Sequence, residues 1–332
     1  MRIFFLLFFF CGLAFAVDYD CVVVGSSPFS LFEALYRANL GDKVLILEQD
    51  AVCGGAWKGI DICGVPNADL GCHLLGNDQN LKSFLEEYAG CKLVCMERPR
   101  FPYDGRASCS NGYYFSKGCY ELIDHLLQML EQTDALVLVN HRVDEVAVDP
   151  SNAFATVKVN ETSFTTKKVV TTQAGSFRVE PLPAGQYRPP TKTKYYHLYL
   201  LVQDPTPPRF SYQSGGVITG INRLMNLTYF LDLDQLGQQL LVIQAGSEDA
   251  LRKGEALINA LKDKNLVDRG AYILRQEPFI YEQAANINSV IRLMETKSQT
   301  LFDVIPTGNF QRMTSYISKW KEALKPYHQV FP

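Results

Sequence analysis

The first residues whose types and spacing could do chemistry lie between Gly25 and Ser30, where the sequence reads G-S-S-P-F-S. A turn that binds a dinucleotide commonly reads G-x-G-x-x-G, because its glycines allow a tight turn and a close approach of the backbone to pyrophosphate. Here Gly25 is the only glycine, and Ser27 and Ser30 occupy the other two positions. Serine is small, its hydroxyl can hydrogen-bond a phosphate, and a following helix offers free N–H groups to the anion. The segment therefore predicts a dinucleotide site with two altered positions.

An acidic residue, Glu48, ends the next apolar run, 23 residues after Gly25. A carboxylate there can accept hydrogen bonds from the two hydroxyls of an adenosine ribose, and it would repel a 2′-phosphate. The alternative is an ordinary acidic strand end. We favour the ribose-binding role, because strand, turn, helix, strand and acid follow one another in the expected order.

A pair of glycines, Gly54 and Gly55, comes just after the acid and is followed by Ala56 and Trp57. Paired glycines let the backbone approach a cofactor closely, although a simple turn would also use them. Further on, residues 69–73 read D-L-G-C-H, which is typical of a strand end that enters a loop.

The elements that must position these residues form a β-α-β unit. Residues 20–24 and 43–48 are apolar runs typical of buried parallel strands, and 28–40 has the apolar spacing of a helix. Elsewhere the patterns predict strands at 60–63, 135–139, 195–202, 240–243 and 273–280, an extended segment at 91–101, a hairpin of 143–148 with 153–159, and helices at 81–88, 120–130, 248–261 and 313–324.

The composition of the chain excludes several classes of function. The chain has 332 residues, of which 47% are hydrophobic and 20% charged, a globular balance with room for one large or two modest domains. A net charge of −3 gives no electrostatic basis for nucleic-acid binding. The sequence has no Ser-His-Asp arrangement, H-E-x-x-H motif or P-loop, so hydrolase and nucleoside-triphosphatase functions have no support. Cys91 and Cys95 lack the companion ligands of a zinc site, and we expect no metal.

Residues 1–16 predict a secretory signal peptide. Arg2 is followed by an apolar stretch and then by Ala14-Phe15-Ala16, an exit that places cleavage after Ala16. An uncleaved membrane anchor is the alternative, but the stretch is short for a span of about 20 residues. We therefore expect export through the secretory pathway, with membrane contact only through this segment. Cys11 lies in it, and the cysteines that remain permit disulfides whose pairing stays open.

These motifs resemble the FAD-dependent amine oxidase, protoporphyrinogen oxidase and phytoene desaturase superfamily, whose fold is shared by UDP-galactopyranose mutase and the Rab GDP-dissociation inhibitor. In that superfamily a glycine pair follows the acid, and a D/E-x-G-x-H-like segment follows a short hairpin, as residues 54–55 and 69–73 do here. Residues 115–122 resemble its P-x-G-G-x-x-x-L helix entry, with Cys119 in place of one glycine. Residues 139–146 resemble the strand whose valine contacts adenine through its backbone, which implies Val143.

The resemblance also implies residues nearer the C-terminus. Residues 305–310 read I-P-T-G-N-F and resemble a strand end in which Gly-Asp lies near the pyrophosphate and ribityl chain, which implies Gly308 and Asn309. Asparagine could still hydrogen-bond a ribityl hydroxyl but carries no charge. Residues 221–228 resemble a cap strand that carries an arginine, so Arg223 could bind an anionic substrate group, and His73 could lie near the flavin. A structural role is the alternative for Arg223 and His73.

The resemblance runs from about residue 18 to residue 324 and implies an α/β fold, in which a Rossmann-like FAD-binding domain carries an inserted α+β substrate (cap) domain. We expect residues 17–174 to form the FAD-binding domain with cap-forming insertions, 175–300 mainly the substrate domain, and 301–332 a return to the FAD-binding domain. The implied function is an exported FAD-dependent oxidoreductase that passes hydride from a small-molecule substrate to flavin. Its catalytic residues and oligomeric state stay open. The alternative is a non-catalytic protein that uses the fold for binding, as the Rab inhibitor does. Ser27, Ser30, Asn309 and the short cap favour this alternative.

Overall fold

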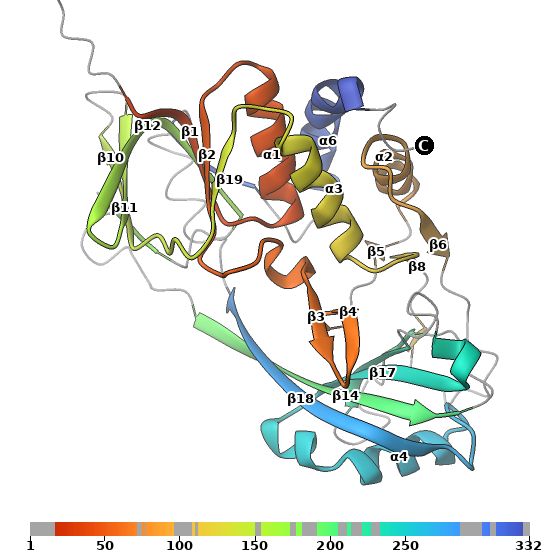
Figure 1. Ribbon diagram of the computed structural model, residues 1–332. Helices are drawn as coiled ribbons and strands as arrows, with labels where there is room; N and C mark the ends of the chain where they lie inside the picture. The colour runs from red at the N-terminus through yellow and green to blue at the C-terminus, as the bar shows by residue number, and fades with distance from the viewer. Residues whose placement is uncertain are drawn as a thin grey trace, which may run out of the picture.

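The computed structural model describes residues 17–71, 75–76, 78–95, 108–109, 112–149, 154–172, 177–180, 191–204, 211–213, 221–226, 233–285, 301–305 and 310–327 (Figure 1). Two main sheets organise the chain. A mostly parallel sheet lies beside a group of helices, and a separate antiparallel sheet lies below both in this view. Among the described residues, no helix combines the length and the apolar character that a membrane crossing requires.

The first sheet has eight strands in the order β13-β10-β11-β12-β1-β2-β9, with β19 also paired to β12. Strands β12, β1, β2 and β9 run parallel to one another. The residues of β2 and the last four of β1 are buried and almost all branched and aliphatic, as expected for strands covered on both faces. The strands are β1 (Tyr19–Val24), β2 (Val44–Leu47), β9 (Leu136–Leu138), β10 (Glu145–Asp149), β11 (Phe154–Val159), β12 (Thr162–Thr171), β13 (Arg178–Glu180) and β19 (Phe302–Val304).

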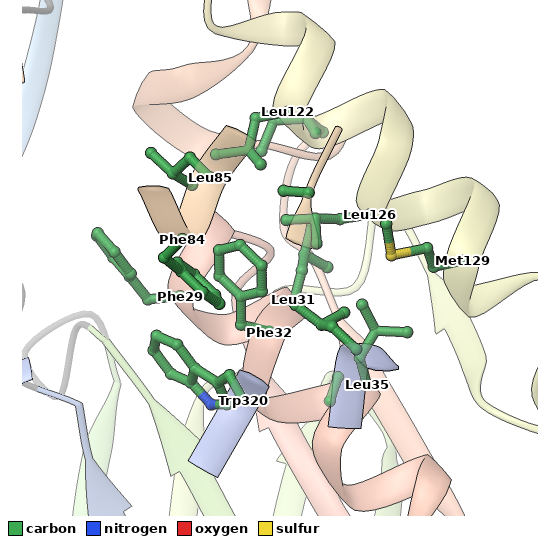
Figure 2. Packing of buried hydrophobic residues seen from close by; sticks show 14 of the residues in the cluster. Phe29, Leu31, Phe32, Leu35, Phe84, Leu85, Leu122, Leu126, Met129 and Trp320 are labelled. Carbon is green, nitrogen blue, oxygen red and sulfur yellow. The ribbon is translucent and has the colours of Figure 1, made fainter. Parts of the chain in front are cut away.

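Four helices pack on one face of this sheet: α1 (Pro28–Asn39), α2 (Gln79–Tyr88), α3 (Tyr120–Leu130) and α6 (Phe310–Leu324). Their apolar side chains meet in one cluster, at whose centre Trp320 of α6 is fully buried and lies within 5.2 Å of the Phe32 ring of α1, centroid to centroid (Figure 2). Burying an aromatic ring of this size contributes a few kcal/mol, so the C-terminal helix stabilises the first domain although it is nearly 300 residues away in sequence.

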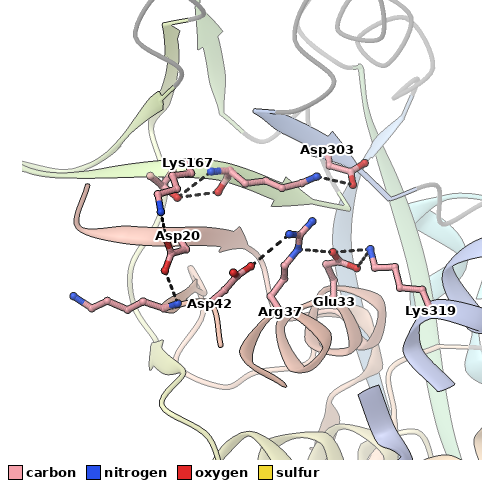
Figure 3. Close-up of polar contacts among 10 residues, drawn as sticks. Asp20, Glu33, Arg37, Asp42, Lys167, Asp303 and Lys319 are labelled. Carbon is pink, nitrogen blue, oxygen red and sulfur yellow. Dashed lines mark hydrogen bonds and ion pairs between the residues drawn. The ribbon is translucent and has the colours of Figure 1, made fainter. Parts of the chain in front are cut away.

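Helix α6 is also held by ion pairs. The Glu33 carboxylate on α1 is fully buried and accepts hydrogen bonds from Arg37 Nε at 3.1 Å and Lys319 Nζ at 2.8 Å (Figure 3). It also accepts one from Trp320 Nε1 at 3.1 Å. We refer to Glu33, Arg37, Lys319 and Trp320 as the clasp. A buried carboxylate is tolerated when cations and donors surround it, and the clasp supplies both.

The second sheet is antiparallel, with the order β18-β14-β17-β16-β15-β7. Helix α4 (Gly254–Asp263) covers one face and the β3–β4 hairpin covers the other. The strands of the second sheet and the hairpin are β7 (Ser108–Cys109), β14 (Thr191–Gln203), β15 (Ser211–Gln213), β16 (Ile221–Asn226), β17 (Gln238–Ala245), β18 (Tyr272–Ala285), β3 (Gly59–Ile62) and β4 (Val65–Asp69). A small third sheet contains β5 (Leu75–Gly76), β6 (Leu93–Cys95) and β8 (Gly112–Phe115).

The sequence patterns predicted most of these elements. The β-α-β unit, helix α3 and the hairpin of β10 with β11 are confirmed. The single helix predicted at 248–261 is wrong, because a 3₁₀ turn (Glu248–Arg252) ends before α4 begins at Gly254. A Cβ at position 254 would lie 2.0 Å from Gln276 Oε1, so the end of the Gln276 side chain on β18 packs against this glycine. Strand β12, the parallel partner of β1, was not predicted.

Candidate cofactor site

The turn after β1 has the backbone that its sequence predicts. Gly25 adopts a φ of +88°, which glycine accommodates without strain. Ser27 caps α1, since its Oγ accepts a hydrogen bond from Ser30 N at 3.3 Å, and Pro28 fills the first helical position. A Cβ added at Gly25 would meet no atom within 4 Å. The turn therefore leaves open space over its backbone, next to the N-terminus of a 12-residue helix.

Ser26 joins this turn to the acid and to the glycine pair. Its backbone N–H donates to Glu48 Oε2 at 3.0 Å, and its hydroxyl donates to the same oxygen at 2.5 Å. The same hydroxyl accepts a hydrogen bond from Gly54 N at 2.8 Å. Ser26 and Glu48 are 1% and 4% exposed, so these bonds are shielded from water. We call Ser26, Glu48 and Gly54 the turn network.

Among the described residues, the other oxygen of Glu48 has one donor, the Asp50 N–H at 2.9 Å. An ionised carboxylate can accept about four hydrogen bonds. Three donors are accounted for within the described chain, so the geometry leaves acceptor capacity for an added hydroxyl.

The glycine pair has two different roles. Gly54 has a φ of +116°, and a Cβ there would lie 3.0 Å from Lys58 N and 3.1 Å from Ile123 Cγ1, so α3 packs directly on this residue. Gly55 has a φ of +56°, and a Cβ there would meet nothing within 4 Å. Gly54 is therefore required for packing, whereas Gly55 exposes its backbone to open space, as a site for a cofactor would need.

Ala56 and Trp57 complete a 3₁₀ turn that starts at Gly55 (Gly55–Trp57). The Trp57 indole packs edge-on against Phe29 at 6.1 Å and Phe115 at 6.0 Å between centroids. Trp57 thus links the glycine pair to α1 and β8. It is half-buried and packs against the core cluster of the first domain.

Three hydroxyl groups occupy the region where the sequence has serines in place of glycines. Ser27 Oγ lies 3.0 Å from Ser30 Oγ and 3.1 Å from Thr172 Oγ1, and Thr172 Oγ1 lies 3.5 Å from Ser30 Oγ. Thr172 follows β12, 145 residues after Ser27, and was not predicted as a site residue. Only the pairing of β12 with β1 brings it here, and that pairing has no local signal in the sequence.

The segment that contains Val143 also reaches the acid. His141 N donates to Glu48 O at 2.7 Å, and Asn140 N donates to Asp50 O at 3.0 Å. The Val143 side chain is 4% exposed and packs in the core on the other face of the first sheet. The segment 140–141 that leads to Val143 therefore runs close to the end of β2, and the role expected for Val143 stays a prediction.

Burial sets the protonation of the thiol in this region. Cys53 precedes the glycine pair and is 6% exposed. Burial raises the pKa of Cys53, with a smaller opposing effect from the Ser26 hydroxyl. The thiol is therefore neutral near pH 7 and adds no charge to the turn network.

The remaining predicted residues lie largely outside the described part of the chain. His73, Gly308 and Asn309 fall in segments that are not described, as does the side chain of Arg223, whose backbone lies in β16. The structure therefore brings together Gly25, Ser27, Ser30, Glu48 and the glycine pair, and their proposed roles stay predictions. No group of three or more potential metal ligands occurs among the residues described.

No protein-family model matches the chain, and no curated protein matches it in sequence. Solved structures do match. A redesigned putrescine oxidase aligns with a TM-score of 0.61 at 12% identity, covering 92% of this chain and 98% of its own. A protein of Exiguobacterium sp. 255-15 assigned as a protoporphyrinogen oxidase aligns with a TM-score of 0.60 at 9% identity, covering 94% and 99%.

NikD, an amino acid oxidase of nikkomycin biosynthesis, aligns with a TM-score of 0.54 at 13% identity, covering 92% of this chain and 94% of its own. At such identities the likeness shows the fold. This chain has the amine oxidase-like flavoprotein fold, and its parallel-rich sheet and antiparallel sheet match the cofactor and substrate domains of that fold.

Proposed function

We propose that this protein binds FAD and acts as an oxidoreductase on a small molecule. The observation that carries the proposal is the turn network: one buried serine ties the β1 turn, the acid at the end of β2 and the glycine pair into one unit. The open space over Gly25 and Gly55 lies along the same unit. A bound dinucleotide needs these three parts to be held together.

The residues present fit FAD. The N–H groups at the start of α1 would face the pyrophosphate, as helix N-termini do for anions. Glu48 would accept hydrogen bonds from the adenosine ribose with its remaining acceptor capacity. Gly55 and Ala56 would let the backbone approach the cofactor, and Val143 would line the adenine side. Gly308 and Asn309 are proposed for the far end of the cofactor by resemblance.

The antiparallel sheet would form the substrate side, with Arg223 and His73 as candidate substrate contacts. When bound, FAD would supply the acceptor for hydride from the substrate. In this scheme the protein binds, orients and excludes water, so a dedicated nucleophile is not required. We propose a small organic substrate of the amine or amino acid class, because two of the similar solved structures are named as oxidases of such compounds.

A second candidate function is binding without catalysis. The hydroxyl groups of Ser27, Ser30 and Thr172 fill the region where a dinucleotide turn usually has bare backbone. If these groups hold the turn closed, the fold would serve as a scaffold for a partner, as in the Rab inhibitor. This alternative makes a distinct prediction, because such a protein would not take up FAD.

Flavin uptake separates the two candidates. Purified protein is denatured and the released nucleotide identified, and apo-protein is then titrated with FAD and separately with NAD⁺. The proposal predicts released FAD, or FAD uptake with absorption near about 450 nm, and reduction of the bound flavin by members of an amine and amino acid panel under anaerobic conditions. Uptake of NAD⁺ without flavin uptake would contradict it. Uptake of neither nucleotide would favour the non-catalytic candidate, and FAD uptake without reduction by any compound would contradict the proposed substrate class.

We also propose export, on the basis of residues 1–16. Mass spectrometry of the chain from its own host should then find Val17 at the N-terminus. An intact Met1 in a cytosolic fraction would contradict export and would leave the cofactor proposal untouched.

A further inference from the structure

Tyr199 connects the antiparallel sheet to the first domain. It lies on β14, is fully buried, and packs in the cluster between that sheet and the β3–β4 hairpin. Its hydroxyl donates to Asp69 O at 2.8 Å and accepts a hydrogen bond from Gly71 N at 2.6 Å. One phenol therefore holds both ends of the segment 69–71, which leads from β4 toward His73.

His197, on the same strand as Tyr199, packs against segment 69–71 from another side. His197 is 2% exposed, and a Cβ added at Gly71 would lie 2.8 Å from its Cε1 atom. The imidazole also stacks on Tyr281 of β18, 5.3 Å between centroids. Gly71 thus lies between the Tyr199 hydroxyl and the His197 imidazole, and a side chain at this position would press on the imidazole.

The same segment is bound to helix α3. Asp69 Oδ1 accepts a hydrogen bond from Cys119 N at 2.7 Å, where α3 begins, and the Cys119 thiol lies 3.5 Å from Asp69 Oδ2. Asp69 and Cys119 are 2% and 1% exposed. One turn further along α3, Ile123 packs against Gly54. A continuous set of contacts therefore runs from Tyr199 through Asp69 and α3 to the glycine pair.

We propose that Tyr199 is a positioning residue: from the substrate sheet it sets the place of segment 69–71 and, through α3, the place of Gly54 in the turn network. Tyr199 need not touch the cofactor in this role. The proposal extends the proposed function, because it gives the substrate sheet a part in shaping the cofactor site. It follows that removing the phenol hydroxyl should disturb Gly54, although Gly54 lies in the turn after β2 and Tyr199 lies in the antiparallel sheet.

The test compares Tyr199→Phe with Tyr113→Phe. Tyr113 is a control, because it is also buried and its hydroxyl also makes a short bond, to Gln79 Oε1 at 2.7 Å, whereas the Tyr199 hydroxyl makes two bonds to segment 69–71. Hydrogen exchange is measured at single amides in the apo-protein, and FAD affinity in the reconstituted protein. We expect Tyr199→Phe alone to speed exchange at the amides of Gly71 and Gly54, and to raise the Kd for FAD about three- to tenfold, the loss expected for one or two hydrogen bonds.

Two other glycines, Gly71 and Gly41, allow an independent comparison. Gly71 and Gly41 have nearly the same φ, +90° and +87°, but a Cβ at Gly41 would meet nothing within 4 Å. Gly71→Ala and Gly41→Ala therefore carry the same backbone strain, and only the first presses on His197. We expect only Gly71→Ala to reproduce the exchange pattern of Tyr199→Phe.

The outcomes are decisive in both directions. If Tyr199→Phe speeds exchange at Gly71 but leaves Gly54 at the rate of the Tyr113→Phe control, Tyr199 is a local packing residue and the proposal is wrong. If the parent protein takes up no FAD, the proposed function fails, and the Gly54 exchange rate still decides whether Tyr199 positions the glycine pair.

Discussion

Two buried carboxylates near helix α1 have different partners. In the clasp, Glu33 is paired with two cations, Arg37 and Lys319, and with the Trp320 indole (Figure 3). In the turn network, the described donors to Glu48 are neutral: the Ser26 hydroxyl and two backbone N–H groups. Both carboxylates are nearly or fully shielded from water.

The difference indicates the roles of the two regions. A carboxylate surrounded by cations has its charge and its acceptor sites used within the protein, which suits a structural contact between α1 and α6. A carboxylate held by neutral donors keeps its charge and part of its acceptor capacity, which suits the binding of hydroxyl groups. The predictions below test whether stability resides in the clasp and binding in the turn network.

The largest expected effect is on stability at the clasp. Glu33→Ala leaves Arg37 and Lys319 without their buried partner and should lower the free energy of unfolding by about 3–5 kcal/mol. Glu33→Gln keeps an acceptor for Trp320 and should cost less. Urea denaturation followed by tryptophan fluorescence measures both. A loss below about 1 kcal/mol in Glu33→Ala would mean that the clasp does not hold α6.

Ser26→Ala should affect FAD binding more than it affects stability. It removes the hydroxyl that joins Glu48 to Gly54, so we expect the Kd for FAD to rise about tenfold or more, as for the loss of a hydrogen bond to a charged group. Thr166→Ala is the matched control, since it removes a buried hydroxyl that bonds Lys168 O at 2.9 Å, outside the site. Equal FAD affinity in Ser26→Ala and Thr166→Ala would remove Ser26 from the cofactor site.

Thiol labelling reports on each region separately. Burial raises the pKa of Cys21, which lies near the clasp, to about 12, and burial also raises the pKa of Cys53 beside the turn network. At about pH 8 both should therefore react with iodoacetamide far more slowly than the exposed Cys95. Peptide mass spectrometry should find Cys21 exposed in Glu33→Ala and Cys53 exposed in Ser26→Ala. The reverse pattern, or labelling of both in each variant, would show that the two regions open together.

The smallest effect should come from an ion pair on the surface. The Lys167 ammonium lowers the pKa of Asp20, with help from the Lys43 N–H. The stability from this lowered pKa is present above the unfolded-state pKa of about 3.9 and is lost as pH falls through the lower folded-state value. Asp20→Asn should thus change stability slightly at neutral pH and flatten its decline in acid. If Asp20→Asn lowered the free energy of unfolding at neutral pH as much as Glu33→Ala does, buried and exposed ion pairs would not differ in the way proposed.

Local sequence patterns predicted the β-α-β unit, Glu48 and the glycine pair, because each depends on residues close together in the chain. The sequence pattern did not predict a role for Ser26, because this residue occupies a position of the G-x-G-x-x-G turn at which any residue is allowed. Its role depends on the side chain of Glu48 and the backbone of Gly54. Thr172 and Tyr199 could not have been found, as their partners are more than a hundred residues away and the strands that bring them together pair only in the folded chain.

Titration of apo-protein with FAD in Glu48→Ala and Glu48→Gln tests the central claim most directly. If Glu48 binds the ribose, Ala removes the charge-assisted hydrogen bond that its remaining acceptor site would make, worth about 1.5–3 kcal/mol, and affinity should fall about tenfold for every 1.4 kcal/mol lost. Gln keeps the shape and one acceptor and should lose less. Flavin fluorescence gives both affinities against the parent protein. FAD binding as tight as the parent's in both variants would show that Glu48 is not at the ribose, and that the β1–α1–β2 unit does not hold the cofactor in the way proposed.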